Sequence, residues 1–351
     1  MGGDEFAVLL KDCDEYGAIN IAKLIISTLS EHLFIWEDTR LFISCSIGIR
    51  IIDHTAETPQ MVHAQADSAC HAAKEQGRNR YNLFSLDNEE LQRRQMEMQS
   101  VNLVHEALSN QRLELFAQPI KSLQQHDAQM YFEILVRIRN GYGDYVSPAL
   151  FIPASERYNI AHWIDKQVIT QTLEWFEQRP EVVEKLGRCS INLSGQSMGN
   201  QEFIDFLLER LERSSMPCEK ICLEITETAA MSNLEQAIEL FTKLKALGCM
   251  IALDDFGSGL SSFGYLKKLP VDIVKIDGLF VRDINVNEMD RVMVRSINDL
   301  AKQLGKVTVA EFVENEQVMQ HLIDLGVDYG QGYGIGHPQP LSELVERLTA
   351  E

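Results

Sequence analysis

The stretch from Ile251 to Asp277 reads I-A-L-D-D-F-G-S-G-L-S-S-F-G-Y-L-K-K-L-P-V-D-I-V-K-I-D, and the fold depends on its pattern. An apolar run ends in two adjacent acids, Asp254 and Asp255, and a second apolar run delivers Lys275. Adjacent carboxylates at the end of a buried strand repel each other and resist loss of water, so a positive group is expected nearby. A divalent cation with oxygen ligands is one such group. A solvated loop with two surface acids is the alternative.

The composition limits the classes of function. The chain has 351 residues, a length that suits two domains, and its hydrophobic content of 45% is ordinary for a globular protein. Its net charge of −20 argues against nucleic-acid binding, which needs a basic surface. An acidic protein that handles an anionic substrate therefore needs metal ions or a few well-placed basic side chains.

The seven cysteines and the lack of a long apolar run bear on location. The cysteine count is odd and no C-x-x-C pair occurs, which is typical of reduced thiols in a cytosolic protein. No signal peptide or membrane-spanning segment is predicted in this chain. We therefore expect a cytoplasmic protein, and an upstream membrane or sensor domain stays open.

From residue 101 onward, strand-like runs alternate with helix-like runs, as in α/β folds. Eight such runs in about 250 residues match the size of a (β/α)8 barrel. The segment from Lys121 to Met130 is too short for a crossover helix, so the first strand should be antiparallel to the rest. The expected strands are Leu113–Gln118, Phe132–Arg139, Cys189–Leu193, Ile221–Thr226, Met250–Asp254, Ile273–Ile276, Val307–Phe312 and Tyr329–Gly332.

Polar residues stand at or near the carboxyl ends of these strands, where barrels place their active sites. They are Glu133, Asn192, Glu224, Glu227, Asp254, Asp255, Lys275, Asp277, Glu311, Glu314 and Gln331. The donors are oxygens without histidine, which favours Mg2+ or Mn2+ over zinc. Such a set can hold two ions, with Asp254 bridging, and suits phosphodiester cleavage. Lys275 either orients water and neutralises charge or serves as a salt-bridge partner.

Eight motifs in order resemble the EAL family of cyclic di-GMP phosphodiesterases, over nearly all of residues 103–345. The motifs are Gln118-Pro119-Ile120, Glu133-Ile134-Leu135-Val136-Arg137, Asn192-Leu193-Ser194, Glu224-Ile225-Thr226-Glu227, Asp254-Asp255-Phe256-Gly257-Ser258-Gly259, Lys275-Ile276-Asp277, Glu311-Phe312-Val313-Glu314 and Gln331-Gly332-Tyr333. The resemblance implies a metal-dependent phosphodiesterase that opens cyclic di-GMP to linear pGpG, with two ions of Mg2+ or Mn2+ per barrel. EAL domains often dimerise, so a homodimer is expected as well.

The resemblance also assigns roles by position. One ion would be held by Glu133, Asn192, Glu224 and Asp254, and the second by Asp254, Asp255 and Glu311. Lys275 would position the attacking water, and Glu227 would anchor the loop after Asp254. The residues assigned to catalysis are thus Lys275, Glu311, Glu227 and Glu133. The residues assigned to the substrate are Gln118, Arg137, Asp277 and Gln331.

Three residues depart from the family pattern beside these positions. Ile134 replaces Ala, Leu260 replaces an aromatic residue, and Phe312 stands where Gly is usual. Extra bulk that shifts a catalytic group by about 1 Å can cost on the order of 100-fold in rate. The alternative function is therefore a catalytically weak EAL-type receptor that binds cyclic di-GMP and signals through a linker helix.

The N-terminal segment resembles the C-terminal part of the GGDEF family of diguanylate cyclases. The matching residues are Gly2–Phe6, Cys45–Gly48, Ala66-Asp67 through Ala73-Lys74, and Gly77–Arg80, and Phe6–Leu10 should be a strand. The family's first half, with a further metal-binding Asp, is missing, so no cyclase activity is expected. Regulation of the barrel by GTP bound to this remnant is a third hypothesis. The expected domains are a truncated GGDEF domain at residues 1–86, a linker helix at 87–102 and the EAL barrel at 103–351.

Overall fold

The computed structural model describes residues 6–31, 34–36, 39–41, 44–52, 58–75, 77, 79–84, 86–124, 129–140, 143–258 and 263–350. The chain forms two compact units, Met1–Met96 and Glu97–Glu351. Helix α3 (Leu86–Ser109) covers the predicted linker and continues into the second unit. Within the described ranges, every helix is too short or too polar to cross a bilayer.

The first unit is small. Helices α1 (Glu15–Glu31) and α2 (Pro59–Glu75) accompany the parallel pair β3 (Ile47–Ile49) and β4 (Tyr81–Leu83). Strands β1 (Phe34–Trp36) and β2 (Thr39–Leu41) form a separate antiparallel pair. The buried apolar cluster of this first unit is formed by Ala18, Ala22 and Ile49, with partly buried neighbours.

The strand expected at Phe6–Leu10 is absent, and that prediction was wrong. These residues are irregular, and the Phe6 side chain is 90% exposed. A strand gains its stability from a neighbour to pair with, and no described segment pairs with this one. The Gly2–Glu5 part of the motif lies outside the described residues.

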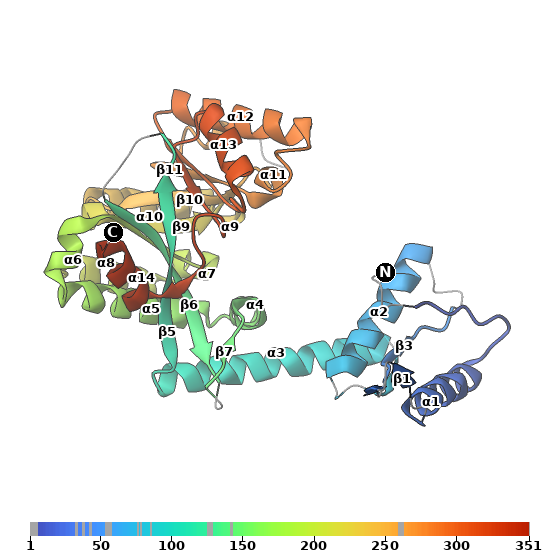
Figure 1. Ribbon diagram of the computed structural model, residues 1–351. Coiled ribbons are helices and arrows are strands. Elements are labelled where there is room, and N and C mark those ends of the chain that lie inside the picture. Colours follow the sequence, from blue (N-terminus) through green and yellow to red (C-terminus); the bar gives the residue numbers. More distant parts are fainter. Residues whose placement is uncertain are drawn as a thin grey trace. The chain divides into compact units, whose positions relative to one another are not determined.

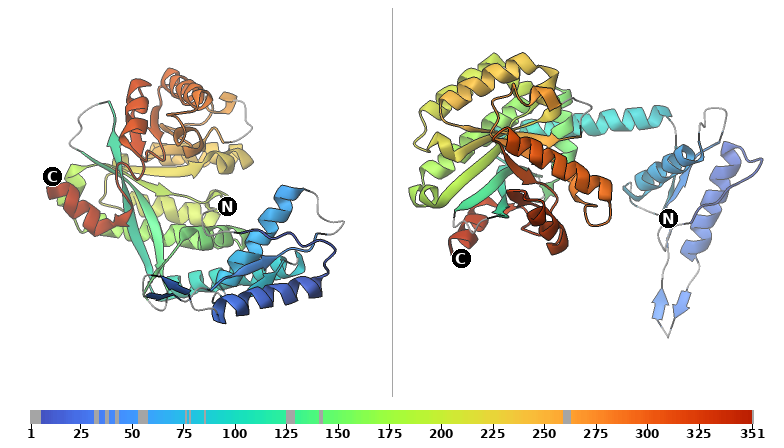
Figure 2. Two further views of the ribbon diagram at one scale, coloured as in Figure 1. Left: turned by 45° about the vertical axis from the view of Figure 1, so that its right-hand side comes forward. Right: turned by 90° about the horizontal axis from the view of Figure 1, so that it is seen from above.

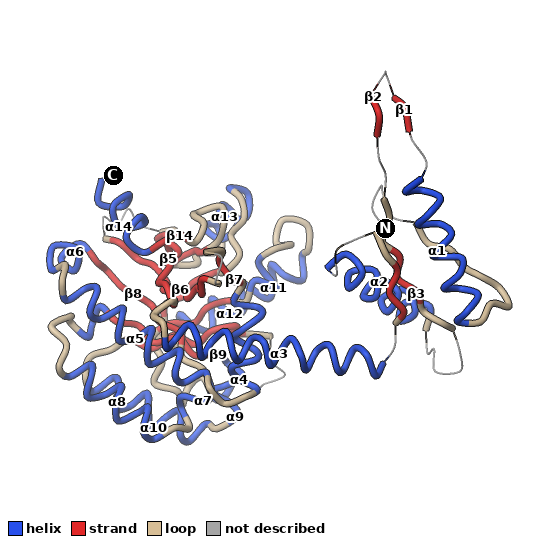
Figure 3. Tube along the Cα trace, turned by 90° about the horizontal axis from the view of Figure 1, so that it is seen from below, coloured by secondary structure: helices blue, strands red, loops and turns tan. Residues whose placement is uncertain are grey.

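The second unit is a closed eight-stranded barrel, as the sequence predicts, with its strands enclosed by helices (Figure 3). The pairing order is β5-β13-β12-β11-β10-β9-β8-β6, and β6 pairs back with β5. Strand β5 is antiparallel to both neighbours, which confirms the expected first strand. The strand bounds are β5 (Leu113–Ser122), β6 (Met130–Arg139), β8 (Leu186–Asn192), β9 (Ile221–Thr226), β10 (Met250–Phe256), β11 (Ile273–Ile276), β12 (Val307–Ala310) and β13 (Tyr329–Gln331). The short strands β7 (Tyr145–Val146) and β14 (Gln339–Pro340) pair with β6 and β5.

Helices cover the outside of the barrel and bury its main apolar core (Figures 1 and 2). Asn233 caps the N-terminus of α10 by accepting from Gln236 N, and Gly248 follows its last turn at φ 96°. The longer helices are α4 (Pro148–Arg157), α5 (Ala161–Glu177), α8 (Gln201–Glu212), α10 (Leu234–Ala246), α12 (Glu288–Gln303) and α14 (Leu341–Ala350). The shorter ones are α6 (Pro180–Lys185), α7 (Gly195–Met198), α9 (Glu227–Ser232), α11 (Gly278–Val281) and α13 (Glu316–Asp324).

The barrel interior contains two layers of side chains, two residues apart along each strand. The lower layer is a separate apolar cluster of Ile120, Cys222, Ala252, Ile273 and Val309, with Tyr131 and Tyr329 packed against it. Because strand side chains alternate, the residues two positions along point the same way. They form the polar upper layer of Gln118, Glu133, Asn192, Glu224, Asp254, Lys275, Glu311 and Gln331. Only on the antiparallel β5 does the polar residue come first.

Candidate functional site

The upper layer is centred on the ammonium group of Lys275, which is only 1% exposed. Its Nζ lies 2.6 Å from Glu224 Oε2, 2.9 Å from Glu311 Oε1 and 3.0 Å from Asp254 Oδ1. Glu133 Oε2 is slightly farther away, at 3.6 Å. Lys275 therefore contacts acids that lie on, or just after, four other strands. These contacts are compatible with both roles considered for Lys275, as a salt-bridge partner and as part of the reactive site.

A second cluster overlaps the first. Asp254, Asp255 and Glu311 each offer a carboxylate oxygen, and these oxygens lie within 4.8 Å of one another. Asp255 has φ 53° beside an irregularity in the pairing of β10 with β11, which turns the backbone at the end of the strand. Burial, together with the neighbouring charges of Asp254 and Asp277, raises the pKa of Asp255 to about 6. A cation bound between these oxygens would remove that repulsion.

The net charge of the site also favours a bound cation. Four carboxylates (Glu133, Glu224, Asp254 and Glu311) contact one ammonium group, and a fifth, Asp255, lies beside Asp254 and Glu311. Burial raises the pKa values of the Glu224 and Glu311 carboxyls, Lys275 opposes this rise, and the neighbouring acids add to it. Burial alone would lower the pKa of Lys275, but the surrounding carboxylates raise it well above its ordinary value. An all-oxygen set with this excess of negative charge fits divalent cations such as Mg2+ or Mn2+.

Amide side chains complete the layer beside Glu133. Asn192 Nδ2 donates to Glu133 Oε1, and Gln331 Nε2 donates to Glu133 Oε2 at 2.6 Å. Gln331 Nε2 is also 3.3 Å from Gln118 Oε1, and Gln118 Nε2 donates to the Gly336 carbonyl at 3.0 Å. The Gln331 Oε1 atom is buried and has no hydrogen-bond partner within the described part of the chain. This unused acceptor is a place where a bound water or ligand could complete the layer.

The loop that follows the two aspartates is tied to a buried glutamate. Glu227 Oε2 accepts a hydrogen bond from Gly257 N at 2.9 Å, and Glu227 Oε1 accepts one from the Tyr265 hydroxyl. Glu227 thus lies where the sequence places an anchor for this loop. Tyr265 was missed, because a tyrosine in a short helical stretch carries no signal that its hydroxyl is buried against an acid.

Two of the predicted substrate residues, Arg137 and Asp277, have their described contacts outside the cluster. The Arg137 guanidinium carbon is 5.4 Å from the centroid of the Phe116 ring, and burial lowers the pKa of Arg137. Asp277 caps α11, because its Oδ1 accepts from Leu279 N at 2.8 Å. Neither side chain makes a direct bond to the carboxylate cluster among the described contacts.

The three departures from the family pattern have different structural consequences. Ile134 is buried in the apolar core between barrel and helices, so its bulk points away from Glu133. Phe312 has φ 54°, and β12 ends at Ala310 rather than at Phe312 as predicted, because this conformation breaks the strand. Leu260 lies outside the described residues.

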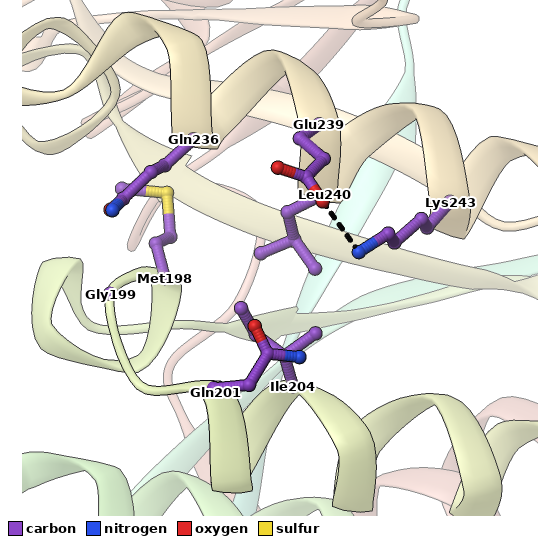
Figure 4. Close-up of a pocket in the computed structure, with 8 residues that line it drawn as sticks. All are labelled: Met198, Gly199, Gln201, Ile204, Gln236, Glu239, Leu240 and Lys243. Atoms are coloured by element: carbon purple, nitrogen blue, oxygen red, sulfur yellow. Dashed lines mark hydrogen bonds and ion pairs between the residues drawn. The ribbon is translucent and has the colours of Figure 1, made fainter.

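A small hollow lies elsewhere, in the helical layer between α7, α8 and α10 (Figure 4). It is lined by residues such as Met198, Ile204 and Leu240, and its Lys243 is paired with Glu239 at 2.7 Å. None of the upper-layer residues lines this hollow. Because its lysine is paired with its glutamate, the hollow offers no unpaired charge for chemistry.

Comparisons with known families agree with the two units. Residues 101–338 match the EAL domain model, and residues 1–80 match the model for "Diguanylate cyclase, GGDEF domain". Cyclic di-GMP phosphodiesterase PdeB of Shewanella oneidensis is 36% identical over 349 residues, which cover 99% of this chain and 40% of the relative. Probable cyclic di-GMP phosphodiesterase PdeA of Escherichia coli is 34% identical over 345 residues, which cover 97% of this chain and 46% of the relative. The chain thus spans less than half the length of these relatives.

Solved structures resemble the second unit. The FimX EAL domain of Pseudomonas aeruginosa bound to c-di-GMP has a TM-score of 0.63 and 30% identity, covering 68% of this chain and 96% of that one. The PaMucR phosphodiesterase in complex with c-di-GMP has a TM-score of 0.62 and 28% identity, covering 70% of this chain and 99% of that one. Both similarities extend over the barrel that carries the carboxylate and lysine cluster.

Proposed function

Because the chain belongs to the EAL domain family, we propose that it is a metal-dependent phosphodiesterase that hydrolyses cyclic di-GMP to linear pGpG. The observation that carries the proposal is the cluster of four carboxylates on Lys275, together with Asp255 beside two of them. The names of relatives such as PdeB, and the c-di-GMP held by the FimX and PaMucR domains, support the choice of substrate.

The site would hold two ions of Mg2+ or Mn2+. Asp254, Asp255 and Glu311 would hold one, and Glu133, Asn192, Glu224 and Asp254 the other, with Asp254 shared. When bound, such a pair lowers the pKa of water and neutralises the charge that develops on the phosphate oxygens. Burial and then the neighbouring acids raise the pKa values of Asp255 and Glu311, and a bound cation would offset both effects, which supports this assignment.

The chain's own side chains bind and orient the substrate. Lys275 stays protonated and is held by its carboxylates, so it can orient the attacking water by donating a hydrogen bond to its oxygen. Arg137 would bind a phosphate oxygen, because its planar donors suit that geometry. Gln118, Gln331 and Asp277 supply further contacts, with Gln331 Oε1 free to accept a hydrogen bond. Glu227 keeps the loop after Asp255 in place through Gly257 N.

The receptor alternative has less support. A receptor that had lost catalysis would be expected to lack cation ligands, whereas every predicted ligand position is filled by a carboxylate or an amide. Ile134, which motivated the alternative, packs into the outer core rather than into the site. Phosphodiesterase activity is therefore the function that the geometry favours.

The surroundings of the enzyme form part of the proposal. All seven cysteines are free thiols, which supports a cytoplasmic location. We also propose a homodimer formed through the EAL domain, and the N-terminal unit is proposed to have no cyclase activity of its own. Sedimentation of the purified chain tests the dimer, and incubation with GTP tests for cyclase products.

A hydrolysis assay tests the function. The wild-type chain, Glu133→Ala, Lys275→Ala and the surface control Glu235→Ala are incubated with cyclic di-GMP and Mg2+ or Mn2+, with and without EDTA. We expect pGpG from the wild type and from Glu235→Ala, no metal-dependent turnover from Glu133→Ala, and a reduced rate with largely intact binding from Lys275→Ala. Tight binding without turnover, insensitive to EDTA, would instead identify a receptor.

A further inference from the structure

Phe312 is an unusual residue beside the site. It follows Glu311 directly, its side chain is 43% exposed, and its φ of 54° lies in the left-handed region that favours glycine. A large residue in this conformation is strained and persists only where its surroundings hold it. Its ring packs onto Gly278, where an added Cβ would lie 2.0 Å from a ring atom.

Helix α11 (Gly278–Val281) connects this ring to the acidic loop. Asp277 caps the helix, and Phe280 packs against Gly257, where an added Cβ would lie 2.9 Å from the ring. Gly257 is the residue that Glu227 holds, two positions after Asp255. The helix therefore lies between the loop that carries the aspartates and the aromatic ring that follows Glu311.

Arg282 follows α11 and stacks on the Phe312 ring. Its guanidinium carbon is 4.0 Å from the ring centroid, and the residue is exposed. Within the described residues, the guanidinium makes no hydrogen bond or ion pair, although the chain carries a net charge of −20. Stacking fixes the plane of the guanidinium and leaves its donors directed outward along that plane.

We propose that Arg282, held flat by Phe312, binds a guanine base of the dinucleotide. The inference rests on the proposed function. The planar donor fork of arginine matches O6 and N7 of guanine, whereas adenine presents an amino donor in place of O6. The carboxylate cluster and Arg137 would take the phosphate, and Phe312 follows Glu311 directly, so Arg282 lies beside the site at a position that a base of the same ligand can reach. Arg282 is thus a specificity-determining residue of this site.

Two variants test the assignment by different routes. Arg282→Ala removes the donors, and Phe312→Gly removes the stacking surface while placing glycine at a φ that glycine adopts readily. We expect each to lower kcat/KM for cyclic di-GMP about 10- to 100-fold, mainly through KM, which is the discrimination one bidentate contact provides. The double variant should be no worse than Arg282→Ala, because both changes remove one contact. Arg295→Ala, which removes an exposed positive charge from α12, should behave as wild type.

The choice of nucleotide probes separates base recognition from general electrostatics. The affinity for cyclic di-IMP, which keeps O6 and N7, should fall in Arg282→Ala as it does for cyclic di-GMP, while the affinity for cyclic di-AMP should not change. Two results with Arg282→Ala would overturn this inference alone, provided that the wild-type chain hydrolyses cyclic di-GMP. One is an equal loss of affinity for all three nucleotides, and the other is an unchanged kcat/KM. A changed sedimentation of Arg282→Ala with intact selectivity among the nucleotides would also overturn it, because Arg282 and Phe312 would then belong to an interface between copies of the chain. A wild-type chain that neither binds nor hydrolyses cyclic di-GMP would overturn the proposed function and this inference with it.

Discussion

The two layers inside the barrel are built on the same strands and differ in almost every chemical respect. Cys222 and Glu224 lie two residues apart on β9, and so do Ile273 and Lys275 on β11. The lower member of each pair belongs to a buried apolar cluster, while the upper member belongs to the charged network. A rise of about 3.3 Å per residue means that less than 7 Å separates the two environments.

This difference shows how the barrel can contain so many buried charges. The lower layer, together with the core under the helices, supplies apolar burial that stabilises the fold. The upper layer should add little stability without a cation, because burial and the neighbouring acids raise the pKa values of Glu224 and Glu311, and buried ion pairs gain little over their cost of desolvation. Stability and chemistry are thus separated along each strand, and substitutions in the two layers should have opposite signatures.

The largest effect is expected for Lys275→Met. Removing the ammonium leaves Glu224, Asp254 and Glu311 buried without their common partner, and breaking a buried ion pair in this way costs about 3–5 kcal/mol. We expect that loss in the free energy of unfolding with EDTA, and a large part of it restored by Mn2+. Loss of the lysine's electrostatic role should lower kcat on the order of 100- to 1000-fold. Urea unfolding and a turnover assay measure the two effects.

Lys306→Met is the matched control for this change. Lys306 lies at the other end of the neighbouring strand, where its Nζ donates to the Val271 carbonyl at 2.7 Å. Its loss should reduce stability by about 1 kcal/mol, with no rescue by Mn2+ and no change in kcat. Equal metal rescue of both variants would contradict the separation of the layers.

In the lower layer, Ile273→Ala should give the opposite signature. The side chain is 1% exposed within the apolar cluster, and such truncations cost about 2–5 kcal/mol. Turnover per folded molecule and the Mn2+ concentration for half-maximal activity should stay as in the wild type. A graded partner, Ile273→Val, should lose about 1 kcal/mol. A shift in metal dependence in either variant would mean that the layers are coupled through β11.

Much of this organisation could be predicted from the sequence. Acids such as Glu133 and Glu311 interrupt apolar runs and so indicate where polar side chains enter the barrel. The Lys121–Met130 connection is too short for a crossover helix, which predicts that β5 is antiparallel. The positions of the upper-layer residues then follow from the geometry of a barrel.

The rest depends on contacts between distant residues. The buried Tyr265 hydroxyl beside Glu227 has no local signal, and the left-handed Phe312 depends on packing against Gly278. The end of β12 at Ala310 follows from that conformation, which an apolar run could not indicate. The irregular Phe6–Leu10 segment shows the converse, since an apolar run does not become a strand without a partner.

At Asp165 we expect an effect of intermediate size, a dependence of the free energy of unfolding on pH. This buried carboxylate accepts from Ser194 N at 2.8 Å and from the Ser197 hydroxyl at 2.6 Å. Burial outweighs these bonds and raises the pKa of Asp165 from 3.8 to about 6. The folded protein thus keeps its proton between those values while the unfolded chain loses it. The corresponding stability is present at low pH and lost as pH rises through about 6.

Asp165→Asn tests this sign. Asparagine can accept the same two hydrogen bonds and does not titrate, so its stability relative to wild type should increase by about 2–3 kcal/mol between pH 4 and pH 7. Urea unfolding at several pH values measures the difference. Parallel stability curves would show that the carboxyl titrates normally, and a relative loss of stability of the variant with rising pH would reverse the assigned sign.

The smallest effect is expected for Tyr265→Phe, which tests how strongly the upper layer depends on its supports. The change removes the hydroxyl that donates to Glu227 Oε1 and leaves the ring packed beside Phe256. One buried hydrogen bond to a charged acceptor contributes about 1.5–3 kcal/mol, and water reaching Glu227 should reduce the observed loss to about 1 kcal/mol. Because Glu227 also holds Gly257 N, a looser loop should weaken Mn2+ binding roughly tenfold, as supports of metal ligands typically do. Titration calorimetry with Mn2+ measures this shift, and Tyr329→Phe in the lower layer provides the control. An unchanged Mn2+ affinity would mean that Gly257 alone fixes Glu227, and that the aspartate loop keeps its position without Tyr265.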